Sequence, residues 1–216
     1  MQMIISKKMA MADKWHVLRM SLFTAVFLSA AATHAATVSV TVVDSAGNPL
    51  SDAAVYAEPS VAAPAAKNAR KVEIEQKDRA FFPLVTVVQA GTEIGFPNHD
   101  TVRHQVYSFS APKVFELKLY AGVPSNPVLF DKPGTVVLGC NIHDQMLAYI
   151  HIVPTPYFGK TDSAGKVKLE GLPSGSYHLK AWHFNLPNGA IIPDQPLNVA
   201  TSDSTASIKL NTKSIK

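Results

Sequence analysis

The chain has 216 residues, with 20 Lys and Arg against 16 Asp and Glu, and a formal net charge of +4. Four of the basic residues, but only Asp13 among the acids, lie in the first 35 residues, so the rest of the chain carries +1. A nearly neutral chain without a basic patch argues against nucleic acid as a ligand. The length allows one large domain or two small ones.

The first 35 residues have the three-part pattern of a secretory signal peptide. A basic stretch from Lys7 to Arg19 precedes an apolar run over 20–32, and Thr33-His34-Ala35 places small residues where a signal peptidase cleaves. The apolar run is too short to span a bilayer, and a non-cleaved membrane anchor is the alternative. We therefore expect residues 1–35 to be removed on export to the periplasm, with no stable membrane insertion afterwards.

Cys140 is the only cysteine of the sequence. In an oxidising compartment, a lone thiol is open to oxidation and mispairing unless something occupies it. A metal ion bound to the thiolate would protect it, which is the first indication of chemistry.

After residue 35 the sequence predicts short strands and almost no helical periodicity. Apolar and β-branched residues alternate with polar ones, and turn residues separate the runs at intervals of about ten residues. In chain order, strands are expected over 38–43, 72–75, 84–88, 92–96, 105–109, 114–119, 135–138, 147–153, 166–169, 177–182 and 207–210. The fold class that follows is all-β, built from sandwiches or Greek-key barrels.

Two segments predict domain boundaries. Residues 58–66 are rich in Ala and Pro, as in a linker, and Pro154-Thr155-Pro156 is a second crossing point. The flanking segments 38–55 and 161–182 each look like half of a unit. Together they carry Asp44, Gly47, Pro49, Leu50, Ala53 and Val55, then Thr161, Asp162, Gly165, Leu169, Leu172, Pro173, Gly175, Tyr177 and Leu179.

This split pattern resembles the carboxypeptidase regulatory-like and transthyretin-like β-sandwich family. The resemblance implies a discontinuous domain of residues 36–66 and 157–216, into which a central domain of residues 70–154 is inserted. Two tandem units with a loose N-terminal hairpin are the alternative.

A cysteine, a histidine and a methionine follow one another at three-residue spacing between two predicted strands. The sequence runs from Gly134 through Cys140-Asn-Ile-His143-Asp-Gln-Met146, so one short loop can present a thiolate, an imidazole and a thioether to a common point. Upstream, His104 enters another strand. Two histidine nitrogens, one cysteine sulfur and a weak axial methionine describe a blue-copper site, and bound copper would keep the cysteine as thiolate.

The central domain resembles the cupredoxins, and within them the amicyanin/plastocyanin-like branch. The shared positions are Val72, Ile74, Phe82, Pro83, Val87, Gly91, Phe96, Asn98, Asp100, His104, Val106, Pro133, Gly134, Cys140, His143 and Met146. The resemblance implies a Greek-key cupredoxin β-sandwich with one type 1 copper ion. His104, Cys140 and His143 would be its equatorial ligands and Met146 its axial ligand. One position departs from the family: the residue after the first ligand histidine is often Asn, which links the two ligand loops, and here it is Gln105.

Taken singly, each of these residues has a simpler structural explanation. A single cysteine or methionine is commonly a core residue, and a single histidine is commonly structural. It is their joint occurrence at the family spacing that favours copper. His99 competes with His104 for the role of first ligand, but His104 fits the position before a strand better. His151 and His183 are expected to be structural.

The predicted function is the transfer of single electrons, without any catalysed bond chemistry. The resemblance implies that His143 lies near the surface in an apolar patch, to which Ile142 and Leu147 contribute. A redox partner, such as a cytochrome c or a periplasmic dehydrogenase, would dock there transiently over a small interface.

Other functions fit the same residues less well. A copper carrier or sensor with the same ligands is the main alternative, which the sequence separates poorly from an electron carrier. A binding module for glycan or envelope protein, with a vestigial copper site, is a third interpretation. A multicopper enzyme would need a second cysteine or a His-x-His pair, which the sequence lacks.

Overall fold

The computed structural model describes residues 35–61, 71–124 and 126–212. These residues form 17 strands and no helix, which confirms the all-β fold class. No helix in the described ranges is long and apolar enough to cross a membrane. Residues 1–34 of the expected signal peptide and residues 62–66 of the expected linker lie outside the described residues.

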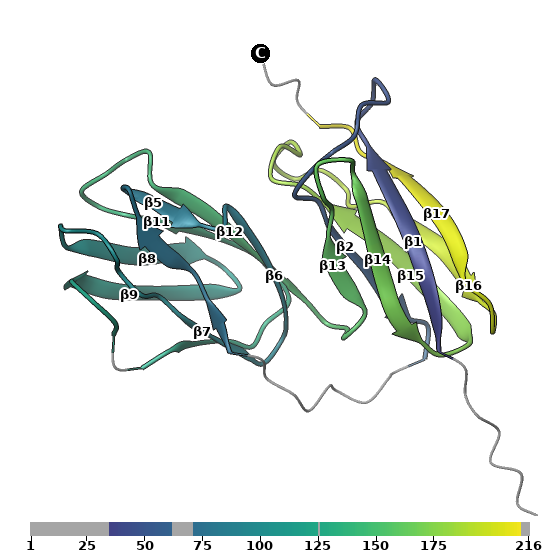
Figure 1. Cartoon of the computed structure of the whole chain (residues 1–216), viewed down its shortest axis with the longest axis horizontal. Helices are drawn as coiled ribbons and strands as arrows, with labels where there is room; N and C mark the ends of the chain where they lie inside the picture. Colours follow the sequence, from purple (N-terminus) through teal and green to yellow (C-terminus); the bar gives the residue numbers. More distant parts are fainter. Residues whose placement is uncertain (1–34, 62–70, 125, 213–216) are drawn as a thin grey trace, which may run out of the picture. The chain divides into compact units, whose positions relative to one another are not determined.

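One group of strands comes from both ends of the described chain. Its members are β1 (Ala36–Val43), β2 (Ala54–Pro59), β13 (Phe158–Lys160), β14 (Lys166–Leu172), β15 (Gly175–Trp182), β16 (Asp194–Val199) and β17 (Ser204–Lys209). They form two sheets, with strand orders β14-β1-β17 and β13-β2-β15-β16 (Figure 1). Strand β1 runs antiparallel to β14 and parallel to β17, whereas β2 runs antiparallel to both of its neighbours. Segments that are more than a hundred residues apart in the chain therefore share both sheets.

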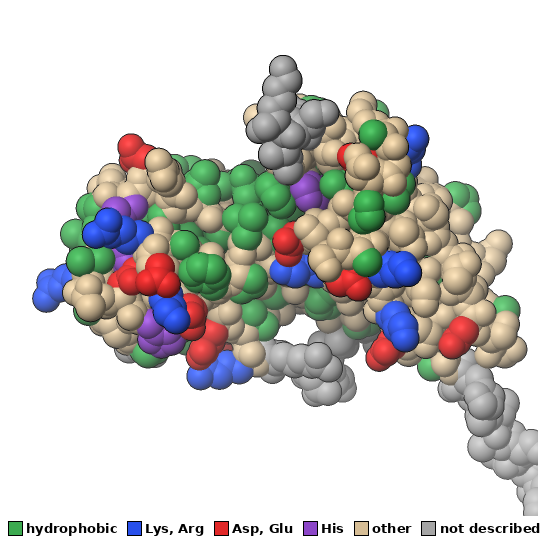
Figure 2. Space-filling view, turned by 45° about the horizontal axis from the view of Figure 1, so that its top comes forward, with side chains coloured by type: hydrophobic (Ala, Val, Ile, Leu, Met, Phe, Trp, Pro, Cys, Tyr) green, Lys and Arg blue, Asp and Glu red, His purple; other side chains and the backbone are tan. Residues whose placement is uncertain are grey.

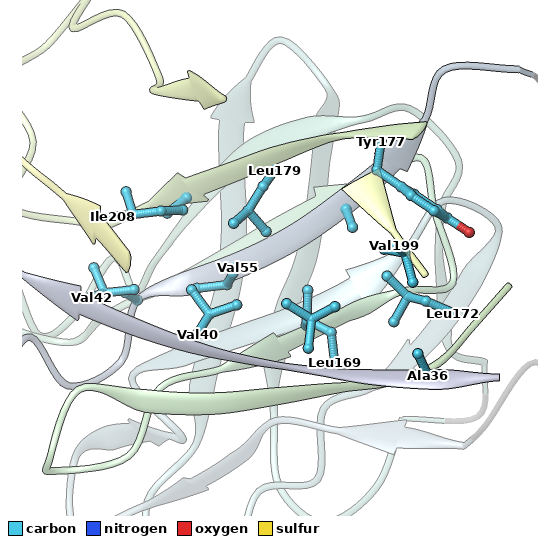
Figure 3. Close-up of a cluster of buried hydrophobic side chains, with 14 of the residues drawn as sticks. Ala36, Val40, Val42, Val55, Leu169, Leu172, Tyr177, Leu179, Val199 and Ile208 are labelled. Atoms are coloured by element: carbon cyan, nitrogen blue, oxygen red, sulfur yellow. The ribbon is translucent and has the colours of Figure 1, made fainter. Parts of the chain in front are cut away.

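The core of this group follows from the two-residue period of strands. In β1, alternate residues are buried, from Ala36 through Val38 and Val40 to Val42. Their side chains pack against buried apolar residues of β2, β14, β15 and β17, among them Leu169 (Figure 3).

Two turns in this group, one in its early half and one in its late half, have the same hydrogen-bonding pattern, and they contact each other. The Asp44 carboxylate accepts backbone N–H groups two and four residues on, and the Asp162 carboxylate does the same. Each turn contains a glycine with positive φ, Gly47 at 92° and Gly165 at 69°. At Gly165 a Cβ would lie 2.5 Å from the Val42 carbonyl oxygen, so a larger side chain does not fit. The Gly165 carbonyl accepts the Val42 N–H at 2.7 Å. This contact joins the early turn region to the late one.

The remaining strands form the central block. They are β3 (Val72–Glu73), β4 (Glu75–Lys77), β5 (Ala80–Phe82), β6 (Val85–Gln89), β7 (Thr92–Gly95), β8 (His104–Ser110), β9 (Lys113–Tyr120), β10 (Val128–Phe130), β11 (Gly134–Gly139) and β12 (Leu147–Val153). A five-stranded sheet has the order β6-β12-β11-β8-β9, a three-stranded sheet has the order β10-β7-β3, and β4 and β5 form a hairpin (Figure 1). Every strand of these three sheets pairs within the block.

A second, separate core lies within the central block. Aromatic and aliphatic side chains from most of its strands fill it, including Phe96, Phe130 and Ile150. Cys140 and Met146 belong to the same cluster of buried side chains. The core therefore contains two of the four predicted copper ligands.

Five strands were not expected from the sequence: β2, β5, β10, β13 and β16. Strand β2 extends into the expected linker, because Glu58 and Pro59 are its last two residues. Its backbone is paired on both sides, by β13 and β15. The strand pairing of the sheets thus overrides the weak β-propensity of Ala, Glu and Pro.

The central block should fold on its own, because the hydrogen-bonded strands of its three sheets all lie within 72–153. We expect a fragment of residues 71–153 to give a cooperative urea unfolding transition and the near-ultraviolet circular dichroism of a packed core. Its stability should be lower than that of the longer chain, because the fragment exposes the ring faces of Tyr149 and His151 that contact Trp182. An unfolded fragment beside stable longer versions would show that the boundary of residues 70–154 is wrong.

Candidate metal centre

The four predicted ligands lie at or next to strand ends, all at the same end of the five-stranded sheet. His104 is the first residue of β8, Cys140 follows the last residue of β11, and Met146 precedes the first residue of β12. His143 lies in the turn between the last two. The Met146 N–H donates to the His143 carbonyl at 2.9 Å, which closes this turn. The short loop between two antiparallel strands therefore carries three of the four residues.

His104, Cys140 and His143 converge. One nitrogen of each histidine and the Cys140 sulfur all lie within 4.8 Å of one another. The His104 Nδ1 to Cys140 Sγ distance is 3.8 Å, and the two imidazole rings are 5.1 Å apart at their centroids. Their separations leave room for a single metal ion among the three donor atoms. The structure thus brings together the three residues that the sequence pattern selected as equatorial ligands.

Burial differs among the ligands in a way that a metal site requires. His104 and Met146 are fully buried, Cys140 is 3% exposed, and His143 is partly exposed. The Nδ1 atom of His143 is buried and has no hydrogen-bond partner among the described residues. A buried ring nitrogen without a partner is costly unless a ligand occupies it. One cysteine sulfur and two imidazoles are donors that suit copper.

Asp100 holds the other side of the His104 ring. Its Oδ2 atom lies 2.6 Å from His104 Nε2, and its two oxygens also accept the backbone N–H groups of Asp78 and Arg79 at 2.8 and 2.9 Å. Burial opposes the negative charge, but the hydrogen bonds from Arg79, His104 and Asp78 hold the pKa of Asp100 below its usual 3.8. Because an ionised carboxylate only accepts, the proton of a neutral His104 lies on Nε2, and the Nδ1 lone pair is directed to Cys140.

Asn98 shapes the loop that leads to His104. Its side-chain amide donates to the carbonyls of Val102 and Tyr120 at 3.0 and 2.8 Å, and its Oδ1 accepts the Asp100 N–H at 2.9 Å. Gln105, the residue that departs from the family pattern, instead donates to Glu116 on the exposed side of the sheet. The loop is therefore held from within by Asn98, and Gln105 takes no part.

A buried polar pair lies beside the ligands. The Tyr120 hydroxyl donates to the Phe96 carbonyl at 2.6 Å, and the fully buried Gln76 amide donates to the same carbonyl and to the Tyr120 oxygen. Burial is the main cause that raises the pKa of Tyr120 to about 12, and the charge of Cys140 raises it too. The hydrogen bond from Gln76 acts in the opposite direction and lowers it. Tyr120 therefore stays a neutral phenol near the site.

The other histidines of the described ranges lie outside this cluster. His99 is exposed and pairs with Glu75 at 3.1 Å, so His104 alone takes the upstream position. His183 uses both ring nitrogens, with Nε2 donating to the Ser51 carbonyl and Nδ1 accepting the Asn185 N–H. His151 is buried, hydrogen-bonds Thr135 at 3.0 Å and stacks on Trp182 with centroids 4.8 Å apart. His151 and His183 thus have the structural contacts expected of them.

Apolar residues are exposed around the ligand loop. Ile142, within the loop, and Leu147, directly after it, are 47% and 45% exposed. Beside Leu147 lies a hollow of about 360 Å³, lined also by Tyr107, Phe109, Ser110, Val137, Leu138 and Gly139. Figure 2 shows exposed hydrophobic side chains over the strands of the central block.

Sequence reasoning missed the roles of Asp100, Asn98, Gln76 and Tyr120. Asp100 and Asn98 were noticed only as members of a family pattern. The four-residue spacing of Asp100 and His104 was a usable signal, because a loop can bring such residues into contact. Gln76 and Tyr120 lie on different strands, so no sequence spacing indicated their contact.

No protein-family model and no curated protein matches the chain. Among solved structures, a purple cupredoxin from Nitrosopumilus maritimus is 18% identical, covering 38% of this chain and 100% of its own, with a TM-score of 0.35. A copper-containing nitrite reductase from Thermus scotoductus is 22% identical, with a TM-score of 0.37; the match covers 52% of this chain and 28% of that enzyme. An oxidised amicyanin mutant is 15% identical, covering 38% of this chain and 82% of its own, with a TM-score of 0.35. The structures similar to this chain thus include cupredoxins, at low identity and partial coverage.

His151 should make the stability of the metal-free protein depend on pH. Burial lowers the pKa of His151 from 6.5 to about 4, so the folded state keeps the ring neutral while the unfolded state takes up a proton below pH 6.5. The contribution of His151 to stability is therefore lost as the pH falls from about 6.5 to about 4, by at most about 3 kcal/mol, and this contribution changes no further at lower pH. Urea unfolding at a series of pH values measures this loss.

The test variant is His151→Gln. Because glutamine does not titrate, this replacement should flatten the loss of stability between pH 6.5 and 4. Equal slopes for His151→Gln and the wild type would contradict the assignment.

Proposed function

We propose that this protein binds one copper ion through His104, Cys140 and His143, with Met146 as a weak axial ligand, and transfers single electrons. The observation that carries the proposal is the convergence of two imidazoles and a buried cysteine sulfur within 4.8 Å, with His143 Nδ1 left without a hydrogen-bond partner in the described part of the chain. Soft sulfur and imidazole donors in this combination select copper over hard cations. Bound copper supplies a centre that alternates between the cuprous and cupric states.

The protein's contribution is to keep the donor atoms in place while the charge changes. His104 and Cys140 are attached to paired strands and buried, so neither side chain can move far or admit water. A donor set that does not rearrange keeps the barrier to electron transfer low. A buried set also leaves no open position for a substrate, which favours electron transfer over catalysis.

The exit for the electron is proposed at His143. It is the only one of the four ligands that is partly exposed, and exposed Ile142 lies within its loop and exposed Leu147 directly after it. An apolar surface of this kind suits brief docking over a small area. The proposed partner is a periplasmic redox protein, such as a cytochrome c or a dehydrogenase, because the N-terminal sequence pattern predicts export.

The alternative of a copper carrier or sensor gains less support from the geometry. A carrier must release its ion to a partner, and this requires ligands that a partner can reach. Here only His143 is partly exposed, while the other three ligands are buried. Burial of the ligands therefore favours a resident ion.

Adding one equivalent of cupric ion to the purified protein should produce an intense blue thiolate-to-copper charge-transfer band. Ascorbate should bleach the band reversibly, because reduction fills the copper orbital that receives the charge. Cys140→Ser should abolish the colour, whereas His99→Ala should keep it, because His99 is exposed and pairs with Glu75. Absorption spectra measured during the titration report all three results. A colourless copper complex of the wild type would rule out the blue-copper assignment.

Met146 should tune the site without holding it together, because a long thioether bond contributes little to affinity. Met146→Leu should keep the blue band and raise the reduction potential, since an apolar side chain favours the less charged cuprous state. Met146→Gln should lower the potential, since an oxygen donor favours the cupric state. Spectroelectrochemical titration measures both shifts.

The comparison variants are His104→Ala and His143→Ala, which should weaken or abolish the colour unless an external ligand replaces the ring. If Met146→Leu lost copper as completely as Cys140→Ser, Met146 would be an essential ligand. The carrier function would then be favoured over electron transfer.

A further inference from the structure

The carboxylate of Asp100 collects three donors from two separate segments. His104 Nε2 and the Arg79 N–H meet Oδ2 at 2.6 and 2.9 Å, and the Asp78 N–H meets Oδ1 at 2.8 Å. The His104 ring is fully buried, whereas the Asp100 side chain is 13% exposed. One negative charge is thus held between a ligand ring and the backbone of a hairpin.

The hairpin supplies its two N–H groups from an unusual turn. Asp78 and Arg79 connect β4 to β5, and both have positive φ, 52° and 58°. This is the conformation of a two-residue hairpin turn of the primed type, in which Asn and Gly are the favoured residues. In this conformation the two successive N–H groups both reach the Asp100 carboxylate.

The consequence falls on the orientation of His104. A carboxylate that accepts from Nε2 keeps the proton on that atom, which leaves the Nδ1 lone pair facing Cys140 Sγ, 3.8 Å away. A second-shell carboxylate of this kind fixes the tautomer and ring angle of a ligand histidine and makes it a stronger donor.

We propose that Asp100 is the positioning residue of the metal centre, and that the turn of the β4–β5 hairpin holds Asp100 in place. Asp100 sets His104 with Nδ1 free for the metal before any metal arrives, and its charge favours the cupric over the cuprous state. The part that concerns copper rests on the proposed function; the part that concerns the ring does not.

The loop around Asp100 does not depend on its carboxylate. Asn98 holds the loop backbone through the Val102 and Tyr120 carbonyls, and it accepts the Asp100 backbone N–H. Replacing the Asp100 side chain by an uncharged one of the same shape therefore removes the negative charge beside His104 and keeps the backbone of the loop in place. Asp100→Asn is this replacement, and Asp100→Ala removes the acceptor altogether.

The first experiment measures the tautomer of His104 in the metal-free protein by ¹⁵N NMR of the labelled histidines. The wild type should show a single neutral tautomer with the proton on Nε2. Asp100→Ala should show a mixture with Nδ1 protonated, because no acceptor then selects Nε2. A wild-type spectrum in which Nδ1 carries the proton, or an unchanged spectrum in Asp100→Ala, overturns the proposal.

The second experiment measures cupric and cuprous affinities. Asp100→Asn should bind cupric ion about 10- to 100-fold more weakly, the range typical for loss of a second-shell partner. The ratio of cupric to cuprous affinity should fall about tenfold, which corresponds to a reduction potential higher by about 59 mV for one electron. Asp144→Asn is the matched control, because Asp144 is an exposed carboxylate next to His143 and makes no contact with His104. An equal shift in both variants would mean that any nearby charge suffices, and would overturn the specific role.

The hairpin is tested by two replacements of Arg79. Arg79→Gly keeps the N–H group and accepts a positive φ, so it should behave as the wild type in both experiments. Arg79→Pro has no N–H group and cannot adopt a positive φ, so it should shift the tautomer and the affinity ratio toward Asp100→Ala. Identical results for the two variants would remove the hairpin from the proposal.

The two proposals can fail separately. If the wild type forms no blue copper complex, the proposed function fails, while the NMR spectra of the metal-free protein still decide whether Asp100 sets the His104 ring. If copper binds as proposed and Asp100→Asn matches Asp144→Asn, the inference alone fails.

Discussion

The convergence of His104, Cys140 and His143 depends on the pairing of β11 with its two neighbours, β8 and β12. Gly139, the last residue of β11, pairs with Leu147 on β12 and with Tyr107 on β8. The chain therefore leaves the sheet at Cys140 and returns to it at Leu147. On the neighbouring strand β8, the first residue, His104, precedes the paired Tyr107 by a few residues. A shift of one residue in this register would turn the side chains of a whole strand to the opposite face of the sheet. At Gly139 a Cβ would lie 2.8 Å from the Tyr107 ring, so any larger residue there would have to displace that ring.

Around this register, the polar groups of the site fall into two classes. Those behind His104 are satisfied by the protein: the ring by Asp100, Asp100 by the hairpin turn, and the loop by Asn98. On the other side, among residues 35–61, 71–124 and 126–212, the Cys140 sulfur has only the 3.8 Å contact with His104, and His143 Nδ1 has no hydrogen-bond partner. Buried polar atoms are almost always paired. The contrast indicates that the donor atoms are kept for a ligand, while their supports are already complete. Metal binding to such a site adds its free energy to the folded state alone.

The group of strands that comes from both ends of the described chain, β1, β2 and β13 to β17, joins two distant parts of the sequence. The Asp44 and Asp162 turns have the same side-chain chemistry, and the backbone contact between Val42 and Gly165 joins them. Thr161 adds a further link, because its hydroxyl accepts the Ala53 N–H and donates to the Leu50 carbonyl. Side chains at fixed turn positions therefore hold together segments whose hydrophobic residues alone would specify only a sheet face. They account for the polar and glycine positions of the pattern seen in the sequence.

The sequence by itself determined the features that depend on local order. Alternation in Ala36–Val43 and His104–Ser110 is a property of consecutive residues, so it predicted strands over 38–43 and 105–109. The spacing of Cys140, His143 and Met146 is equally local, because one short loop carries all three. Only the tertiary structure decided that β2 is a strand despite its Ala, Glu and Pro, since two neighbouring strands supply its hydrogen bonds. It also decided the contacts of Asp100 with the β4–β5 hairpin and of Gln76 with Tyr120. Such contacts join residues whose separation in the chain carries no period, so they exist only once packing has brought the strands together.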